Sequence, residues 1–148
     1  MKRLIPLFIL LVITIVSGCT VPPPDKPYII DANTDRNFGV AGENIDVVVT
    51  VKNPTTIDFN GNVLIKADMP RCFNMNSVTV GTTRVDGYLN IITVEAGKTN
   101  SALMTMHIPE RNEQNCYQPS NHKLSIFVLQ GEKVLSTTEI DFALFERR

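Results

Sequence analysis

The stretch Ile45-Asp46-Val47-Val48-Val49-Thr50-Val51-Lys52 decides the fold, because its side chains alternate in character. Apolar side chains occupy every second position from Ile45 to Val51, and Asp46 and Thr50 are among the residues between them. A period of two residues is typical of a strand that buries one face and exposes the other. The valines add to this preference, since β-branched residues pack well on a pleated sheet. The stretch therefore predicts a half-buried β-strand.

Similar runs follow along the chain and are separated by turn residues such as Asn60-Gly61-Asn62, Asp86-Gly87 and Gln130-Gly131-Glu132. No convincing helical stripe occurs outside the first residues. We expect further strands at 28–31, 62–69, 77–80, 89–94, 102–108, 123–129 and 133–144. This pattern predicts an all-β fold, an immunoglobulin or fibronectin III-like antiparallel β-sandwich of about seven strands.

The first residues have the layout of an export signal. Lys2 and Arg3 precede an apolar run from Leu4 to Val16, which is shorter than the about 20 residues of a membrane-spanning helix. The run ends in Val16-Ser17-Gly18-Cys19, which resembles the lipobox of prokaryotic lipoproteins (bacterial or archaeal). That resemblance implies a signal-peptide helix over residues 1–18 and a lipid on the Cys19 sulfur. A retained membrane anchor and a plain secretory signal remain as alternatives.

The signal reading divides the chain into three parts. Residues 1–18 form the signal, residues 19–27 a proline-rich linker that begins at the lipidated cysteine, and residues 28–148 the β-sandwich domain. Lys2 and Arg3 leave with the signal, so the mature chain has 12 basic and 15 acidic residues and a net charge of −3. This charge gives no basic footprint for nucleic acid. We therefore expect an extracytoplasmic protein that the Cys19 lipid attaches to the cell membrane.

Two cysteines remain once Cys19 is assigned to the lipid. Cys72 and Cys116 form an even pair in an exported protein, and oxidising compartments favour a disulfide. If successive strands alternate in direction, both cysteines follow strands that end at the same pole of the sandwich, opposite the linker. We therefore predict a Cys72–Cys116 bridge. Metal binding and redox chemistry are the rival interpretations of the pair. Two explanations stay open for the length of the segment 110–121 between two strands: the segment is functional, or it is a long loop that the bridge holds in place.

The order of turns resembles CARDB and NEW3-type modules, which are small immunoglobulin-like domains of prokaryotic surface proteins. The resemblance rests on Val51-Lys52-Asn53-Pro54 at a strand end, on Gly61 to Ile65 leading to Met69-Pro70, and on Val94-Glu95-Ala96-Gly97-Lys98-Thr99. It implies roles in binding, spacing or adhesion and supplies no catalytic residues. The cysteines at 72 and 116 are a departure from that pattern.

Motifs of enzymes are missing from the sequence. The chain contains no GxSxG or HExxH motif and no glycine-rich phosphate loop, so we expect a protein that is not an enzyme and that needs no cofactor. A soft-metal reading can be built from Met104, Met106 and His107, and from Cys116 and His122. Alternation places His107 on the opposite strand face from the methionines, however, so core packing explains them better and we predict no metal site.

An apolar patch is the remaining candidate site. In three strands expected to share a sheet, Leu64, Phe127, Leu129 and Leu135 point away from the core-facing residues, and a contiguous patch of that kind marks a partner site. Two alternatives stay open: the same residues are scattered or covered, or the register of one strand is reversed. The predicted function is a non-enzymatic protein-binding or accessory role in the cell envelope. The alternatives are a copper carrier and a structural subunit of an envelope complex.

Overall fold

The computed structural model describes residues 24–110 and 121–145. The described residues form nine strands and one short 3₁₀ helix, namely β1 (Tyr28–Thr34), β2 (Phe38–Val40), β3 (Asn44–Lys52), β4 (Phe59–Ala67), η1 (Pro70–Phe73), β5 (Asn76–Val80), β6 (Thr83–Val94), β7 (Thr99–His107), β8 (Asn121–Gln130) and β9 (Lys133–Phe145). The predicted all-β fold is confirmed. In this part of the chain no helix has the length and apolar character needed to cross a membrane. The signal helix predicted for residues 1–18 lies outside the described residues.

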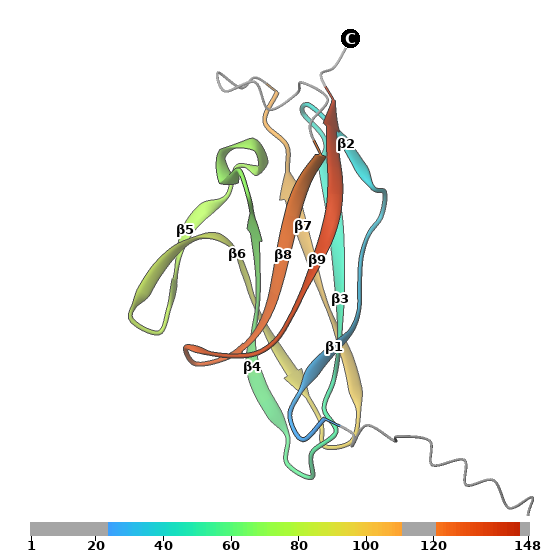
Figure 1. Cartoon of the computed structure of the whole chain (residues 1–148), viewed down its shortest axis with the longest axis vertical. Coiled ribbons are helices and arrows are strands. Elements are labelled where there is room, and N and C mark those ends of the chain that lie inside the picture. Colours follow the sequence, from blue (N-terminus) through green and yellow to red (C-terminus); the bar gives the residue numbers. More distant parts are fainter. Residues whose placement is uncertain (1–23, 111–120, 146–148) are drawn as a thin grey trace, which may run out of the picture.

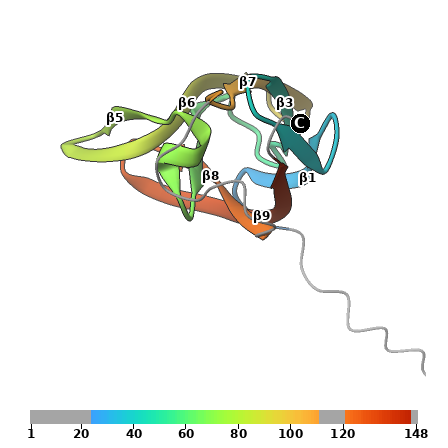
Figure 2. The same ribbon diagram turned by 90° about the horizontal axis from the view of Figure 1, so that it is seen from above.

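Two sheets pack face to face around one core (Figures 1 and 2). One sheet has three strands in the order β1-β3-β7, and the other has six in the order β2-β9-β8-β4-β6-β5. Neighbouring strands are antiparallel except for β2, which runs parallel to β9. The start of β1 and η1 lie at opposite ends of the sandwich (Figure 1). The linker pole and the pole of Cys72 are therefore opposite, as the strand directions predicted.

The core follows the alternation in the sequence. The side chains of Ile45, Val47, Val49 and Val51 on β3 have no exposed surface. Across the sandwich, the six-stranded sheet contributes residues of β4 and β8 with the same period, including Val63, Ile65, Leu124, Ile126 and Val128. Removing these side chains from water supplies the main driving force for the sandwich.

Asn53 explains why the Val51-Lys52-Asn53-Pro54 sequence marks a strand end. Its side chain is fully buried, and its amide nitrogen donates hydrogen bonds to the carbonyl oxygens of Ile57 at 2.8 Å and Val94 at 3.0 Å. Its amide oxygen accepts hydrogen bonds from the backbone N–H and the hydroxyl of Thr55. One buried polar side chain therefore holds the β3–β4 turn against the end of β6, with its hydrogen-bonding groups satisfied.

Three features depart from the strands predicted by the sequence. Strand β2 has only three residues, η1 follows β4, and β6 begins at Thr83 instead of residue 89. Residues 83–87 of β6 pair with β5, and residues 88–94 pair with β4. The β5–β6 hairpin, residues 76–87, therefore projects beyond β4 as a two-stranded ribbon, here called the arm (Figure 2).

The structure corrects the predicted orientation of Leu135. Leu129 pairs with Val134, but Val128 pairs with Ser136, so Leu135 is an extra residue on β9. This β-bulge turns Leu135 into the core, where its side chain is 6% exposed. Val134 takes the outward position that the alternation had assigned to Leu135. A strict period of two along residues 133–144 is wrong at the bulge, because one inserted residue reverses the faces beyond it.

Candidate functional site

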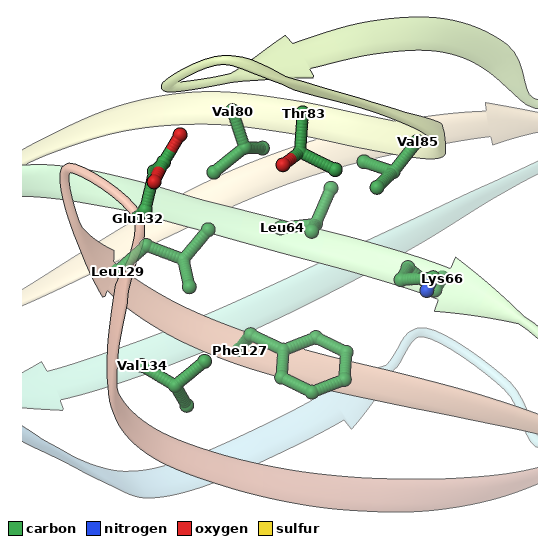
Figure 3. Close-up of a pocket in the computed structure, with 9 residues that line it drawn as sticks. All are labelled: Leu64, Lys66, Val80, Thr83, Val85, Phe127, Leu129, Glu132 and Val134. Carbon is green, nitrogen blue, oxygen red and sulfur yellow. The ribbon is translucent and has the colours of Figure 1, made fainter.

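An apolar pocket lies on the outer face of the six-stranded sheet (Figure 3). Its volume is about 240 Å³, and the residues that line it come from β4, the arm and the β8–β9 hairpin. They are Leu64, Lys66, Val80, Thr83, Val85, Phe127, Leu129, Glu132 and Val134. We call this site the outer pocket.

Strand pairing brings the predicted patch residues together at its floor. Leu64 on β4 is directly opposite Phe127 on β8, and Leu129 is the next outward residue along β8. The structure therefore gathers Leu64, Phe127 and Leu129 and sends Leu135 to the core. Leu64 and Leu129 are buried and Phe127 is half-buried, so these residues form the floor of a pocket instead of an exposed surface patch.

The arm supplies the wall that the sequence analysis missed. In its hairpin register, Val80 pairs with Thr83 and Val78 with Val85, so these four side chains share one face. The opposite face carries the polar side chains of Ser77, Thr79, Arg84 and Asp86. Figure 3 shows Val80, Thr83 and Val85 directed toward Leu64. The alternation of residues 76–87 predicts that one face of the arm is apolar. The sequence does not show which face of the sheet the arm covers.

Two hairpin tips meet beside the outer pocket. The turns Gly81-Thr82 and Gly131-Glu132 each have a glycine with φ near +60°, as in type II′ hairpin turns with two central residues. The Glu132 carboxylate accepts hydrogen bonds from the backbone N–H and the hydroxyl of Thr82, the latter at 2.7 Å. These bonds lower the pKa of Glu132, the backbone bond most. The ionised carboxylate therefore joins the arm to the β8–β9 hairpin.

Cys72 lies at the pole away from the linker. It belongs to η1, is fully buried and is disulfide-bonded. The other two cysteines, Cys19 and Cys116, lie outside the described residues, so the Cys72–Cys116 pairing and the lipid on Cys19 stay predictions. Asn121, where β8 begins five positions after Cys116, lies at the same pole, since β8 runs antiparallel to β4 and its Leu124 pairs with Ala67 before η1.

Side chains beside Cys72 form a tightly packed cluster. The ring of Phe73 has no exposed surface and lies 5.4 Å from the His122 ring, edge to face, with 5.9 Å between its centroid and that of Phe142. The Nδ1 atom of His122 lies 3.2 Å from the Asp68 carboxylate. These contacts join η1 to β8 and β9 at the pole of the predicted bridge.

The residues that could ligate a soft metal ion do not come together in the described part of the chain. Met104 and Met106 are buried in the core, whereas His107 is exposed on the other strand face and lies 2.9 Å from the Asn44 side-chain oxygen. His122 packs on Phe73, and Cys116 is outside the described residues. Within residues 24–110 and 121–145, no three His, Cys, Asp or Glu side chains are grouped for a metal ion.

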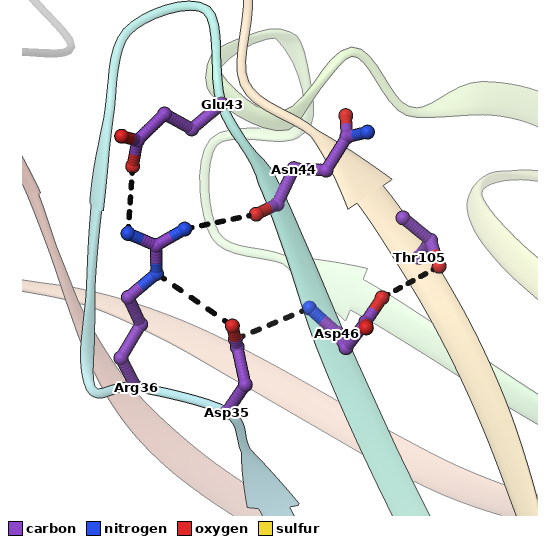
Figure 4. Close-up of polar contacts among 6 residues, drawn as sticks. All are labelled: Asp35, Arg36, Glu43, Asn44, Asp46 and Thr105. Atoms are coloured by element: carbon purple, nitrogen blue, oxygen red, sulfur yellow. Dashed lines mark hydrogen bonds and ion pairs between the residues drawn. The ribbon is translucent and has the colours of Figure 1, made fainter.

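A polar network near the pole of Cys72 has a structural role (Figure 4). Arg36 forms an ion pair with Glu43 at 2.8 Å and donates to the Asn44 carbonyl oxygen at 3.2 Å. Asp35 lies 3.6 Å from Arg36 and accepts a hydrogen bond from the backbone N–H of Asp46. The acidic groups are thus occupied by partners within the chain, and they fix the β1–β2 turn against β3.

Comparisons with known proteins identify the fold. No protein-family model and no curated protein sequence matches the chain. The CARDB domain of the PF1109 protein from Pyrococcus furiosus, solved in complex with di-metal ions, is similar with a TM-score of 0.52 at 8% identity. The match covers 82% of this chain and 93% of that one. The predicted likeness to CARDB modules is therefore confirmed for the immunoglobulin-like fold.

In two other similar structures the matched region is only part of a larger protein. The sporulation control protein Spo0M from Bacillus subtilis has a TM-score of 0.51 at 10% identity, with 82% of this chain and 50% of that chain covered. The alkylpurine DNA glycosylase AlkC from Pseudomonas fluorescens has a TM-score of 0.53 at 16% identity, with 81% and 30% covered. This chain thus spans half or less of those proteins. At such identities the likeness shows the fold alone, because one sandwich serves many functions.

Proposed function

We propose that this chain is a lipid-anchored envelope lipoprotein whose extracytoplasmic β-sandwich binds a protein partner without enzymatic activity. The Val16-Ser17-Gly18-Cys19 sequence supports the anchor, and the outer pocket supports the binding role. The pocket is the observation that carries the proposal. Its predicted occupant is an apolar side chain on the surface of the partner protein.

The size and chemistry of the outer pocket favour a protein over a small molecule. Its volume of about 240 Å³ is below the roughly 300–1,000 Å³ of most small-molecule sites. Protein interfaces, by contrast, concentrate their binding energy where an apolar anchor fills a small pocket inside a polar rim. Lys66 and Glu132 give the rim one charge of each sign, which fits a mixed protein surface better than an anionic polymer such as nucleic acid.

The anchor is tested by Cys19→Ser. We expect this variant to leave the membrane fraction and appear in the soluble extracytoplasmic fraction, because the modified sulfur is gone and the mature charge of −3 does not attract anionic lipid. Fractionation followed by immunoblotting measures the change, and circular dichroism of the released protein checks that it remains folded. A variant that stays in the membrane would identify the apolar run as the anchor and contradict the lipoprotein proposal.

The binding role is tested by Phe127→Asp. We expect this substitution to reduce recovery of a stoichiometric partner at least about tenfold, because a carboxylate in an apolar anchor pocket costs more than one order of magnitude in affinity. Affinity purification from detergent-solubilised membranes, with quantitative mass spectrometry, measures the ratio.

Ile91→Asp is the matched control for Phe127→Asp. Ile91 is 78% exposed and does not line the outer pocket, so the same change of chemistry there should leave partner recovery unchanged. Equal loss in both variants would show that the partner does not use the pocket. A partner retained by Phe127→Asp would contradict the proposed site even if the protein is lipid-anchored.

A further inference from the structure

Strand β5 is an open edge of the six-stranded sheet. Among the described strands it pairs with β6 alone, and the pairing closes at Val80 and Thr83 across the turn with two central residues. In such a hairpin the closing pair exchanges both backbone hydrogen bonds, and bonded and non-bonded pairs then alternate. Val80 and Val78 therefore bond to β6. The backbone N–H and C=O groups of Ser77 and Thr79 point away from the sheet.

Two other edge strands of the sandwich, β7 and β1, each have a backbone group bonded to a side chain of the six-stranded sheet. On β7, the Leu103 carbonyl oxygen accepts a hydrogen bond from the Asn90 side chain of β6 at 3.2 Å. On β1, the Ile29 N–H donates to the Ser136 hydroxyl of β9 at 3.1 Å. Edge β2 has only three residues. Proteins also protect open edges with lysine, proline or a bulge, and the sequence Asn76-Ser77-Val78-Thr79-Val80 has none of these.

We propose that the β5 edge pairs with the β5 edge of a second copy of this chain. The two strands run antiparallel about a two-fold axis at Val78, so that Ser77 of each copy is opposite Thr79 of the other. The outward N–H and C=O groups of these residues then satisfy one another, as an isologous interface requires. The pairing joins two arms into one four-stranded ribbon, which makes the marginal two-stranded arm part of a larger sheet.

The side chains of β5 and β6 suit this register. Val78 of each copy meets its equivalent on the apolar face of the arm. On the polar face, each cross-strand row runs from Arg84 through Thr79 and the second copy's Ser77 to its Asp86. Each row therefore has one positive and one negative end, and no like charges are neighbours. Charge and hydrogen bonding are both self-complementary, which favours a second copy over an unrelated strand.

A cysteine at the two-fold axis tests the register in the full chain. The equivalent positions of a non-bonded antiparallel pair have Cα atoms about 4.5 Å apart, within the range of a disulfide. We expect Val78→Cys to form a disulfide-linked dimer as the main product after mild oxidation of the purified protein in detergent, measured by electrophoresis without reductant. The unsubstituted chain, with its native cysteines, gives the background.

Thr79→Cys is the matched control. Its cysteine is more exposed, but residue 79 is opposite residue 77 of the second copy, so the two introduced cysteines are diagonal and beyond disulfide reach of about 7 Å. We expect it to stay at background. Dimer from Thr79→Cys equal to that from Val78→Cys would indicate random collision and overturn the proposal, as would background levels in both.

Proline at position 79 tests the backbone bonds themselves. In the Val78→Cys chain, Thr79→Pro removes an N–H that points away from β6, so the hairpin keeps its own ladder while the second copy loses a donor. We expect crosslinking to fall to background, with Thr79→Val retaining it and circular dichroism unchanged in both. Undiminished crosslinking with proline would overturn the edge pairing. The outcome is independent of the lipid anchor and of the Phe127→Asp test.

Discussion

Phe73→Ala is expected to lower the free energy of unfolding by about 3–5 kcal/mol, the range for truncation of a buried phenylalanine. The Phe73 ring has no exposed surface and packs between the rings of His122 and Phe142. Truncation leaves a cavity beside Cys72 that these partners can refill only in part, because β8 and β9 hold them in a hydrogen-bonded sheet. Truncation of Phe73 should therefore cost more unfolding free energy than truncation of an aromatic residue at the surface.

Chemical denaturation followed by far-ultraviolet circular dichroism measures this effect, since the chain has no tryptophan for fluorescence. Phe38→Ala is the matched control, because Phe38 is 40% exposed and has an edge contact with Phe145 at 6.1 Å. We expect it to cost about 1 kcal/mol or less, within the range for aromatic pairs at the surface. Equal costs for the two variants would show that η1 is not part of the cooperative core.

The sandwich was predictable because its core residues follow a simple period. The alternation of residues 45–51 and 123–128 assigns each side chain to the inner or the outer face of its sheet, and the burial of every second side chain confirms those assignments. Asn53 was predictable only as a turn residue. That its amide is buried and bonded to Val94 depends on a contact across 41 positions, which local sequence does not encode.

The outer pocket was predictable in part. Leu64, Phe127 and Leu129 were assigned to one face because each lies on a regular stretch of strand. The predicted orientation of Leu135 was wrong because a bulge is a property of two paired strands. The sequence of one strand alone gives no sign of the extra residue. The wall that the arm forms was not predicted, for a related reason. Strand β6 changes its partner from β5 to β4 between residues 87 and 88, and such an exchange follows from tertiary packing.

Loss of the predicted Cys72–Cys116 bridge should have an effect as large as that of Phe73→Ala. The bridge would close a loop of roughly 45 residues, and the chain-entropy model gives about 4 kcal/mol for a loop of that length. We expect Cys72→Ala to lower the free energy of unfolding by about that amount. Reductant should destabilise the unsubstituted chain to a similar extent and leave Cys72→Ala unchanged, because the variant has no bridge to lose.

The pairing itself is decided by non-additivity. If Cys72 and Cys116 are partners, Cys116→Ala alone costs about as much as Cys72→Ala, and the double variant costs little more than either, since each substitution breaks the same bond. Cys19→Ser should cost nothing by the same measurement and serves as the control. Additive losses, or a large loss in Cys19→Ser, would contradict the pairing. A peptide map without reductant would then show Cys72 joined to Cys19, which would also remove Cys19 from the proposed lipid anchor.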